Sequence, residues 1–318
     1  MATERASASD IRMGRRVTLR DLQVLLAVAQ FGSMAKAASH LSITQPAISQ
    51  AVANLERAFS ARLIDRGPRG AVLTSYGEAI QQRGLEVFDA LQLGARDIKY
   101  LSNPGSGDVW IGANEVLLGG FVPAVVQRLA DQHPKIVVHA LTANTSEFEF
   151  EKLRERKLDL LLGRIMPQVD DDLSVETLFE EGISIVVGQS SPWARRRKVT
   201  LAELGSEPWI FSEPDNIVRS HLSQVFRNNG LDDPQISVVT VSMHLRLALV
   251  GTGKYLSTIP NSLLRYSANR WSLKILPIDL GLRLPVGIFT LKDRTLSPAA
   301  LNVIKNVRSV AKAVAKEW

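Results

Sequence analysis

The sequence predicts an α/β protein with three parts: a small helical domain, one long helix and two α/β lobes. Three observations support this expectation. Residues 18–59 carry three short runs of apolar residues at helical spacing, residues 75–102 form a helical pattern without proline, and the remainder alternates strand-like and helix-like segments. A chain of 318 residues, 45% hydrophobic and 22% charged, is long enough for two or three globular domains.

Positive charge is concentrated near the N-terminus. The net charge is +6, and residues 12–74 hold nine basic against three acidic residues, whereas the rest balances at 29 against 29. This segregation favours a polyanionic partner for the N-terminal domain over a charge that only aids solubility. The chain has no cysteine, which excludes disulfides and thiolate chemistry.

No targeting or membrane-spanning segment is expected. Residues 1–17 lack the apolar centre of a signal peptide, and no apolar run approaches the ~18–20 residues of a transmembrane helix. We therefore expect a cytoplasmic protein that makes no membrane contact, with residues 1–16 as a disordered tail.

Three helices and a hairpin are expected in residues 17–75. Thr18, Ser33 and Thr44 are suitable N-caps, and Gly32 is a suitable stop for the first helix. The expected inward residues are, in turn, Leu22, Leu25, Leu26 and Ala29; Met34, Ala37, Ala38 and Leu41; and Ile48, Ala51, Val52, Leu55 and Phe59. The segment "RLIDRGPRGAVLT" then predicts a two-stranded hairpin around its Gly-Pro-Arg-Gly turn.

Three helices with a tight turn before the third, followed by a hairpin, form a winged helix-turn-helix pattern. In that arrangement the helix that begins at Thr44 would enter the major groove of DNA. Its outer positions are small or amide residues rather than Glu and Lys, and amides can make bidentate contacts to adenine. A surface helix beside a charged loop is the structural alternative.

The helix of residues 76–102 has a heptad-like seam. Positions 80, 84, 87, 91, 94, 98 and 101 are Ile, Gly, Val, Leu, Gly, Ile and Leu. We expect this helix, with a linker to residue 104, to mediate dimerisation, because the small preceding domain offers little surface to cover it. Packing on its own domain is the alternative.

Residues 105–318 are expected to form two α/β lobes, lobe I from 105–168 and 272–318 and lobe II from 169–271. The order strand-helix-strand-helix-strand after residue 107 implies a parallel sheet. "LSVETLF" and "GISIVVG" are expected to form a strand pair, and residues 273–290 to return as two strands.

The stretch from "LRDLQVLLAVAQFGS" through "TQPAISQ" to the wing "LxxRxxRGxxLTxxG" resembles the N-terminal domain of LysR-type transcriptional regulators. A looser similarity continues through "LRERKLDLLLG", "PWI" and "GTGKYLSTIP". The resemblance implies a periplasmic-binding-protein-like effector domain, a dimer or tetramer formed through residues 76–102, and contacts to promoter DNA and RNA polymerase. The residues that it implies for DNA contact are Thr44, Gln45, Pro46, Ser49, Gln50, Asn54, Arg66 and Arg69.

The resemblance also implies a small-molecule effector between the lobes, with no other cofactor and no metal. The residues that it places there are Asn114, Glu115, Val116, Asn144, Thr145, Ser146, Gly163, Arg164, Phe211, Ser212 and Met243, with His244 as a weaker candidate. "LDLLLGR" is similar to the branch with galactose-responsive and protocatechuate-responsive regulators, which suggests a sugar or a hydroxylated aromatic acid. An inward Glu115 would repel a second ligand carboxylate unless Arg164 compensated.

Other functions fit the sequence less well. A solute-binding protein would share the two-lobed domain, but the missing export signal and the basic residues 12–74 argue against this alternative. "SMAK" at 33–36 lacks the companion motifs of penicillin-recognising enzymes, and "GTGK" at 251–254 lacks the first glycine of a P-loop. We therefore expect a regulator and not an enzyme.

Overall fold

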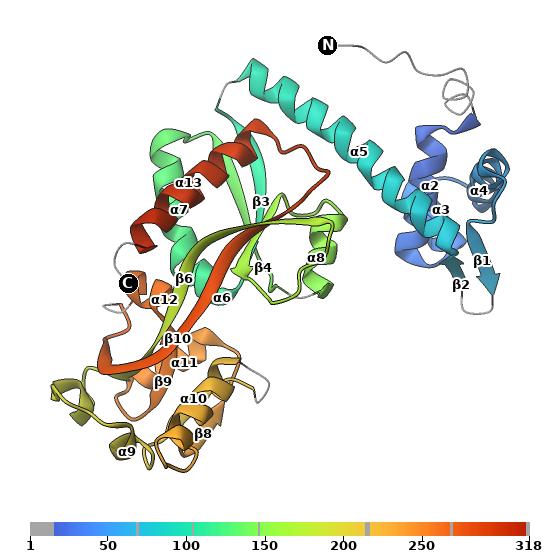
Figure 1. The fold of residues 1–318 in the computed structure, drawn as a ribbon. Helices are drawn as coiled ribbons and strands as arrows, with labels where there is room; N and C mark the ends of the chain where they lie inside the picture. The colour runs from blue at the N-terminus through green and yellow to red at the C-terminus, as the bar shows by residue number, and fades with distance from the viewer. Residues whose placement is uncertain are drawn as a thin grey trace. The chain divides into compact units, whose positions relative to one another are not determined.

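The computed structural model describes residues 16–67, 70–103, 105–145, 147–213, 217–267 and 270–315 (Figure 1). It divides into two compact units, unit 1 (Met1–Ala95) and unit 2 (Arg96–Trp318). The expected tail of residues 1–16 lies, except for Arg16, outside the described residues. In the described part of the chain no helix is both long and apolar enough to cross a membrane.

Unit 1 begins with α2 (Leu19–Phe31), α3 (Met34–Leu41) and α4 (Gln45–Phe59). The Thr18, Ser33 and Thr44 side chains accept hydrogen bonds from backbone N–H groups of the first turns, so the three predicted N-caps are confirmed. The helix interiors meet in one core that includes Val28, Ala37, Ile48, Val52 and Leu55.

The inward face of α2 differs from the predicted stripe. Leu25 is fully buried as expected, but Val24 and Val28 join it in the core, while Leu22 and Leu26 are only half-buried. The reason is a second neighbour of α2. Leu22 and Leu26 face Gly84 of the following long helix, close enough that a β-carbon there would lie 3.6–3.9 Å from their side chains.

The wing is the predicted hairpin, β1 (Ile64–Gly67) and β2 (Gly70–Leu73), paired antiparallel. Glu56, next to the buried Leu55, accepts a hydrogen bond from the Leu63 backbone N–H at 2.9 Å and so fixes the wing to α4. Gly77 approaches the Leu63 carbonyl so closely that a β-carbon would lie 2.1 Å from the oxygen. These contacts explain the "LE" and "LTxxG" elements of the sequence in structural terms.

The seam of the long helix α5 (Ser75–Ser102) is divided between two environments. Ile80 packs against the unit 1 core and Gly84 is buried against α2, so packing within the domain accounts for the first part of the predicted seam. Leu91, Ile98 and Leu101 are 53%, 67% and 77% exposed in the single chain. The dimerisation hypothesis therefore applies to the part of α5 after Gly84.

Unit 2 holds one eight-stranded sheet with the order β4-β3-β5-β10-β6-β9-β7-β8. Its strands are β3 (Gly107–Ala113), β4 (Ile136–Thr142), β5 (Leu160–Arg164), β6 (Leu173–Gly188), β7 (Trp209–Phe211), β8 (Ile236–Val239), β9 (Leu256–Pro260) and β10 (Leu273–Leu291). Its helices are α6 (Glu115–Gly119), α7 (Phe121–Gln132), α8 (Glu147–Arg154), η1 (Pro192–Arg195), α9 (Leu201–Leu204), α10 (Ile217–Asn228), α11 (Met243–Gly251), α12 (Asn261–Ser267) and α13 (Pro298–Ala315).

Helices cover both faces of the sheet in each lobe. In lobe I, Val109 and Ile111 pack with α7 and α13, whereas Trp110, between them on β3, belongs to the cluster with Phe150 of α8. In lobe II, Trp209 packs with α10 and the adjacent Ile210 packs with α11. The predicted parallel sheet of lobe I is present as β4-β3-β5. Lobe II also has parallel pairs, in the order β9-β7-β8.

Two strand predictions are wrong. "LSVETLF" and "GISIVVG" do not pair with each other but form one strand, β6, and residues 273–290 belong to the single strand β10. β6 and β10 pair antiparallel along both lobes, with register shifts between residues 275 and 287. Leu276, Leu280, Leu282 and Leu284 accordingly belong to the lobe II core, so the chain returns to lobe I after the predicted boundary at residue 272.

Candidate functional site

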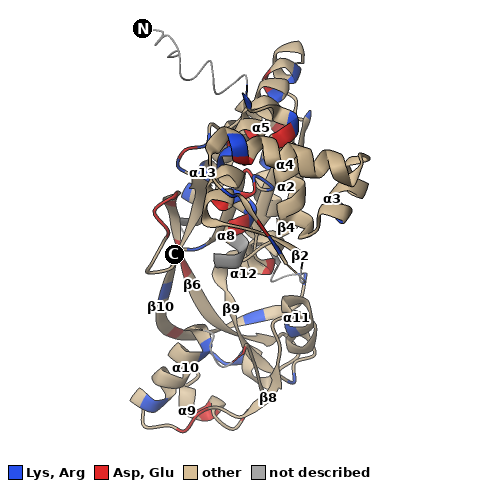
Figure 2. Ribbon diagram, turned by 90° about the vertical axis from the view of Figure 1, so that its right-hand side faces the viewer, with Lys and Arg blue, Asp and Glu red and all other residues tan. Residues whose placement is uncertain are grey.

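The first half of α4 offers an uncharged polar surface. Thr44, Gln45, Pro46 and Gln50 are exposed and Ser49 is half-buried, while Ile48 and Val52 on the opposite side are fully buried. The charged residues of the helix, Glu56 and Arg57, lie near its C-terminal end. Most of α4 is accordingly tan in Figure 2, where charged residues are blue or red. The helix is thus held by its apolar side and presents its amides outward.

The amide of Gln50 has a defined orientation. Arg57 donates to the Asn54 side-chain oxygen, and a guanidinium carries only donors, so the oxygen of the Asn54 amide must face it. Gln50 Nε2 donates to the same oxygen at 2.9 Å. Asn54 therefore binds the NH₂ group of Gln50, and the side-chain oxygen of Gln50 stays available to accept a hydrogen bond. The sequence did not reveal this arrangement.

The wing carries the predicted cations Arg66 and Arg69. Arg66 lies on β1 opposite Ala71 and is exposed. Arg69 lies outside the described residues. β2 is fixed to the domain near the turn by the hydrogen bond from Ala71 N–H to the carbonyl of Gly32, the residue after α2, at 2.9 Å. Arg66 is therefore presented from a hairpin whose two strands are held at α4 and at the end of α2.

In unit 2, Glu115 joins the two lobes. It follows β3 in lobe I, and its Oε2 accepts a hydrogen bond from Met243 N–H at the start of α11 in lobe II, at 2.8 Å. Val116 packs against the lobe II core, and Asn114 caps α6 by accepting from Leu117 N–H at 3.0 Å. Glu115 is exposed and makes this contact between the lobes.

The ends of β4 and β5 bring two further predicted residues together. Gly163 is buried, and the Cγ2 of Thr145 lies 2.4 Å from the place where a β-carbon of residue 163 would be. Glycine at 163 therefore makes room for Thr145. Asn144 is exposed, Arg164 is half-buried at the end of β5, and Ser146 lies outside the described residues.

Lobe II contributes a cation that sequence reasoning missed. Arg246 on α11 is 4% exposed and donates from Nη2 to Ser212 Oγ at 2.7 Å and to the Thr240 carbonyl at 2.9 Å. Ser212 thus lies beside a buried guanidinium. Phe211, at 2% exposed, stacks on Trp209 in the lobe II core.

The remaining lobe II candidates differ in exposure. Met243 is half-buried against the lobe II core and donates its N–H to Glu115. His244, the weaker candidate, is exposed and meets Trp271 edge-on at 5.0 Å between ring centroids. Met243 is therefore placed at the contact between the lobes, and His244 on the outer side of the helix.

A buried acid lies on the strand that joins the lobes. Glu181 of β6 is 6% exposed and accepts hydrogen bonds from both the backbone N–H and the hydroxyl of Ser262. Burial raises the pKa of Glu181, although the Ser262 hydrogen bonds and the charge of Arg164 oppose this shift. The folded protein therefore holds a proton on Glu181 more tightly than the unfolded chain does.

We expect Glu181→Gln to change how stability depends on pH. A raised folded-state pKa gives stability that is complete below the unfolded-chain pKa and is lost as pH rises through the folded value. The unfolding free energy of the variant relative to wild type should therefore increase from acid to neutral pH in urea titrations. Glu176→Gln is the matched control with the opposite trend, because the hydrogen bond from Arg308 lowers the pKa of Glu176. Parallel curves for wild type and Glu181→Gln would contradict the assignment.

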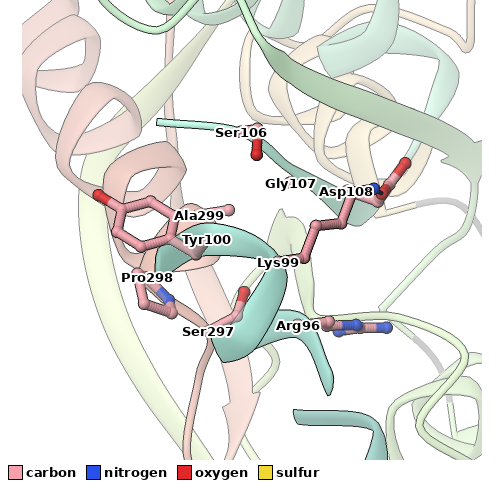
Figure 3. A pocket seen from close by; sticks show the side chains of 9 residues that line it. All are labelled: Arg96, Lys99, Tyr100, Ser106, Gly107, Asp108, Ser297, Pro298 and Ala299. Carbon is pink, nitrogen blue, oxygen red and sulfur yellow. Dashed lines mark hydrogen bonds and ion pairs between the residues drawn. The ribbon is translucent and has the colours of Figure 1, made fainter. Parts of the chain in front are cut away.

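The C-terminal turns of α5 are fixed to lobe I by two cations (Figure 3). Arg96 pairs with Asp159 at 3.1 Å and lies over the Trp110 ring at 5.2 Å from its centroid. Lys99 pairs with Asp108 at 3.0 Å, and both line a small hollow with residues 297–299 at the start of α13. The end of the helix is therefore part of unit 2.

The chain has a winged helix-turn-helix unit, one connecting helix and two α/β lobes that share two long strands. This combination defines the class of DNA-binding regulators that carry a ligand-binding domain. Family models match both parts: "Bacterial regulatory helix-turn-helix protein, lysR family" over residues 19–78 and "LysR substrate binding domain" over residues 102–312. The chain belongs to the LysR family. It is a LysR-type transcriptional regulator with a DNA-binding helix-turn-helix domain and an effector-binding domain.

Transcriptional regulators from bacteria are similar in sequence to most of the chain. The transcriptional regulator YdcI of Escherichia coli is 28% identical over 92% of this chain and 96% of its own length. The transcriptional regulator GbpR of Azospirillum brasilense is 27% identical over 93% of this chain and 87% of its own length. These similarities support the family, and they do not assign the sub-branch suggested by "LDLLLGR".

Solved structures share the fold. Full-length CbnR in complex with its target DNA has a TM-score of 0.61 at 19% identity, covering 92% of this chain and all of CbnR. A full-length OxyR variant from Pseudomonas aeruginosa has a TM-score of 0.63 at 19% identity, covering 94% of this chain and 97% of OxyR. At such identities the likeness concerns the fold.

Proposed function

We propose that the chain binds promoter DNA as a dimer or tetramer and that an effector between its lobes modulates this binding. The observation that carries the proposal is the surface of α4, where exposed neutral residues at the helix N-terminus lie opposite a fully buried stripe. Gln45, Ser49 and Gln50 would read base edges in the major groove, and the N–H groups of the first turn, with Thr44 and Pro46, would lie against phosphate.

The proposal assigns separate roles to the wing and to α5. Arg66 and Arg69 would contact the DNA backbone, which adds affinity without sequence preference. The exposed seam after Gly84 would join two chains, so that two recognition helices meet successive half-sites. The DNA complex of CbnR, a protein of similar fold, supports this use of the N-terminal unit.

The effector would act by binding one arrangement of the oligomer more tightly than another. The candidate effector residues lie at or just after the ends of β3, β4, β5 and β7 or at the start of α11, and the hydrogen bond between Glu115 and Met243 supports a binding place between the lobes. Contact with RNA polymerase would follow from promoter binding. A solute-binding role is disfavoured by the basic helix-turn-helix unit, and the proposal assigns no catalysis to the chain.

A gel-shift titration on the promoter upstream of the protein's own gene tests the proposal. Binding should be sequence-selective, and with 6–10 phosphate contacts the affinity should fall roughly 10³–10⁵-fold between about 50 and 200 mM salt. If competitor DNA of random sequence displaced the bound promoter at the same concentration as competitor promoter DNA does, sequence-specific regulation would be refuted.

We expect Gln50→Ala and Arg66→Ala to affect binding in different ways. Gln50→Ala should cost ~1–3 kcal/mol against the preferred base at one operator position and relax the preference there. Arg66→Ala should weaken all sequences alike and reduce the salt slope by about 1. Binding measurements on the operator and on single-base variants separate the two effects. Equal losses on operator and random DNA for Gln50→Ala would remove Gln50 from base recognition.

A further inference from the structure

Arg57, Asn54 and Gln50 form a chain of hydrogen bonds along the outer side of α4. The three residues are spaced by three and four positions, so their side chains are neighbours on one side of the helix. Arg57 donates from Nη2 to Asn54 Oδ1 at 2.5 Å, and Gln50 Nε2 donates to the same oxygen at 2.9 Å. The opposite side of α4 is buried in the core of unit 1, so this chain lies on the side that the proposed function turns toward DNA.

The guanidinium of Arg57 is held in place by the helix itself. Its Nε donates to the carbonyl of Ala53, one turn earlier, at 3.2 Å. The neighbouring acid is engaged elsewhere, because one oxygen of Glu56 accepts from the backbone N–H groups of Leu63 and Ile64 in the wing. Among the described residues the guanidinium is therefore bound to a carbonyl and an amide oxygen, and to no carboxylate.

The polarity of both amides follows from the donors of Arg57. A guanidinium has only donors, so Asn54 must turn its oxygen toward it. That oxygen can accept a second hydrogen bond but cannot donate one, so Gln50 must offer its NH₂ group. The reverse orientation of Gln50 would place two carbonyl oxygens against each other. Because a hydrogen bond from a charged donor is roughly twice as strong as a neutral one, Arg57 sets the order of the chain.

The oxygen of Gln50 and one of its two N–H groups remain for a partner outside the chain. The side chain is exposed, and the oxygen accepts no hydrogen bond from the described residues. In the major groove adenine offers an N6 amino donor beside the N7 acceptor, and cytosine offers an N4 amino donor. Guanine and thymine present the acceptors O6 and O4 instead. An oxygen held outward would meet these acceptors without a hydrogen between them, which costs affinity.

We propose that Arg57 is a positioning residue that acts through Asn54 to fix the Gln50 amide, so that Gln50 selects a base with an amino group in the major groove. Adenine is preferred because it uses both the oxygen and the free N–H of Gln50, and cytosine comes second with one hydrogen bond. Arg57 itself does not touch a base in this arrangement. The inference rests on the proposed function and names the base chemistry that one residue of α4 reads.

Single-base scanning of the promoter upstream of the protein's own gene tests the base assignment by gel shift. The position at which Gln50→Ala relaxes the preference should favour adenine over guanine by about 5–100-fold in wild type. A purine nucleotide without the 6-amino group, placed there instead of adenine, should weaken wild-type binding about 2–10-fold and leave Gln50→Ala unaffected. A preference for guanine or thymine, equal binding of the two purines by wild type, or no position that depends on Gln50 would overturn the inference.

The ratio of adenine to guanine affinities at this position tests the role of Arg57. Arg57→Leu should lower the ratio at least about threefold, because the amides of Asn54 and Gln50 can then reverse together, whereas Arg57→Lys supplies only donors and should keep it. Arg62→Leu is the matched control, since it removes another exposed arginine of unit 1 that lies outside this chain of hydrogen bonds. The control should affect both affinities alike. Each ratio compares one sample on two DNAs, so a smaller folded fraction does not change it.

Asn54→Asp gives a second, independent test. A carboxylate only accepts hydrogen bonds, so it holds the NH₂ group of Gln50 without help from Arg57. In this background Arg57→Leu should leave the adenine-to-guanine ratio unchanged, although the added negative charge weakens binding to every sequence. An unchanged ratio for Arg57→Leu alone, or an equal fall in both backgrounds, would show that Arg57 does not orient Gln50.

Failure of the inference and failure of the proposed function are distinguishable. If wild type prefers the promoter to random DNA but the position read by Gln50 does not select an amino group, the regulator stands and the inference fails. If wild type binds promoter and random DNA equally throughout the salt titration, the proposed function itself fails.

Discussion

Leu91→Asp combined with Ile98→Asp is expected to convert the protein to a monomer and to weaken operator binding about 10²–10⁴-fold. The side chains of Leu91 and Ile98 are 53% and 67% exposed, respectively, in the single chain. They lie seven residues apart on one face of α5. Two chains joined through this face would bind two half-sites, so the second contact becomes intramolecular. Separating the chains removes that advantage without touching α4.

Oligomeric state and DNA affinity should be measured on the same samples, by sedimentation and by gel shift. The matched control is Gln82→Asp with Gln92→Asp, which adds the same charge to α5 at exposed positions outside the seam. The control should remain oligomeric and bind the operator. An oligomeric double seam variant, or a control that dissociates equally, would exclude this face as the interface.

Asp159→Ala is expected to destabilise unit 2 by about 3–5 kcal/mol, because it removes one partner of a buried ion pair. Asp159 and Arg294 are each 3% exposed at their side chains and pair at 3.1 Å. The same carboxylate accepts from Arg96 at 3.1 Å and from Trp110 N–H at 2.9 Å. Its loss should also release the last turns of α5 from lobe I.

Urea denaturation followed by circular dichroism measures this effect. Asp170→Ala is the control, because Asp170 is about half exposed and its partner Arg154 keeps Glu151 and Asp172. The control should cost less than about 1 kcal/mol. Similar losses for the two variants would show that burial of the Asp159 pair contributes nothing beyond a surface contact.

The elements that sequence predicted well are those whose signals are local. Thr44 as a cap, Pro46 in the first turn and the stripe around Ile48 and Leu55 are all set within one helix, and the structure confirms them. The buried face of α2 was predicted less well. Leu22 and Leu26 pack against Gly84 of α5, a helix distant in the sequence, and not against the core of the three short helices.

The errors and omissions arise where the two lobes meet. β6 was expected as two strands because Glu180, Glu181 and Gly182 interrupt its apolar pattern, yet these residues lie where the strand passes between cores. Arg246 was missed because an arginine within a helix ordinarily faces solvent. Only tertiary structure shows that its acceptors are Ser212 and Thr240.

The shared strands β6 and β10 determine how the protein can be dissected. Each strand contributes to the sheet of both lobes, so any fragment that ends between residues 173 and 291 would separate a strand from the one beside it. The exposed edge would be prone to pair with other chains. Deletion analysis should therefore cut within α5 near residue 95 and keep residues 96–318 whole, and expression of either lobe alone should give insoluble material.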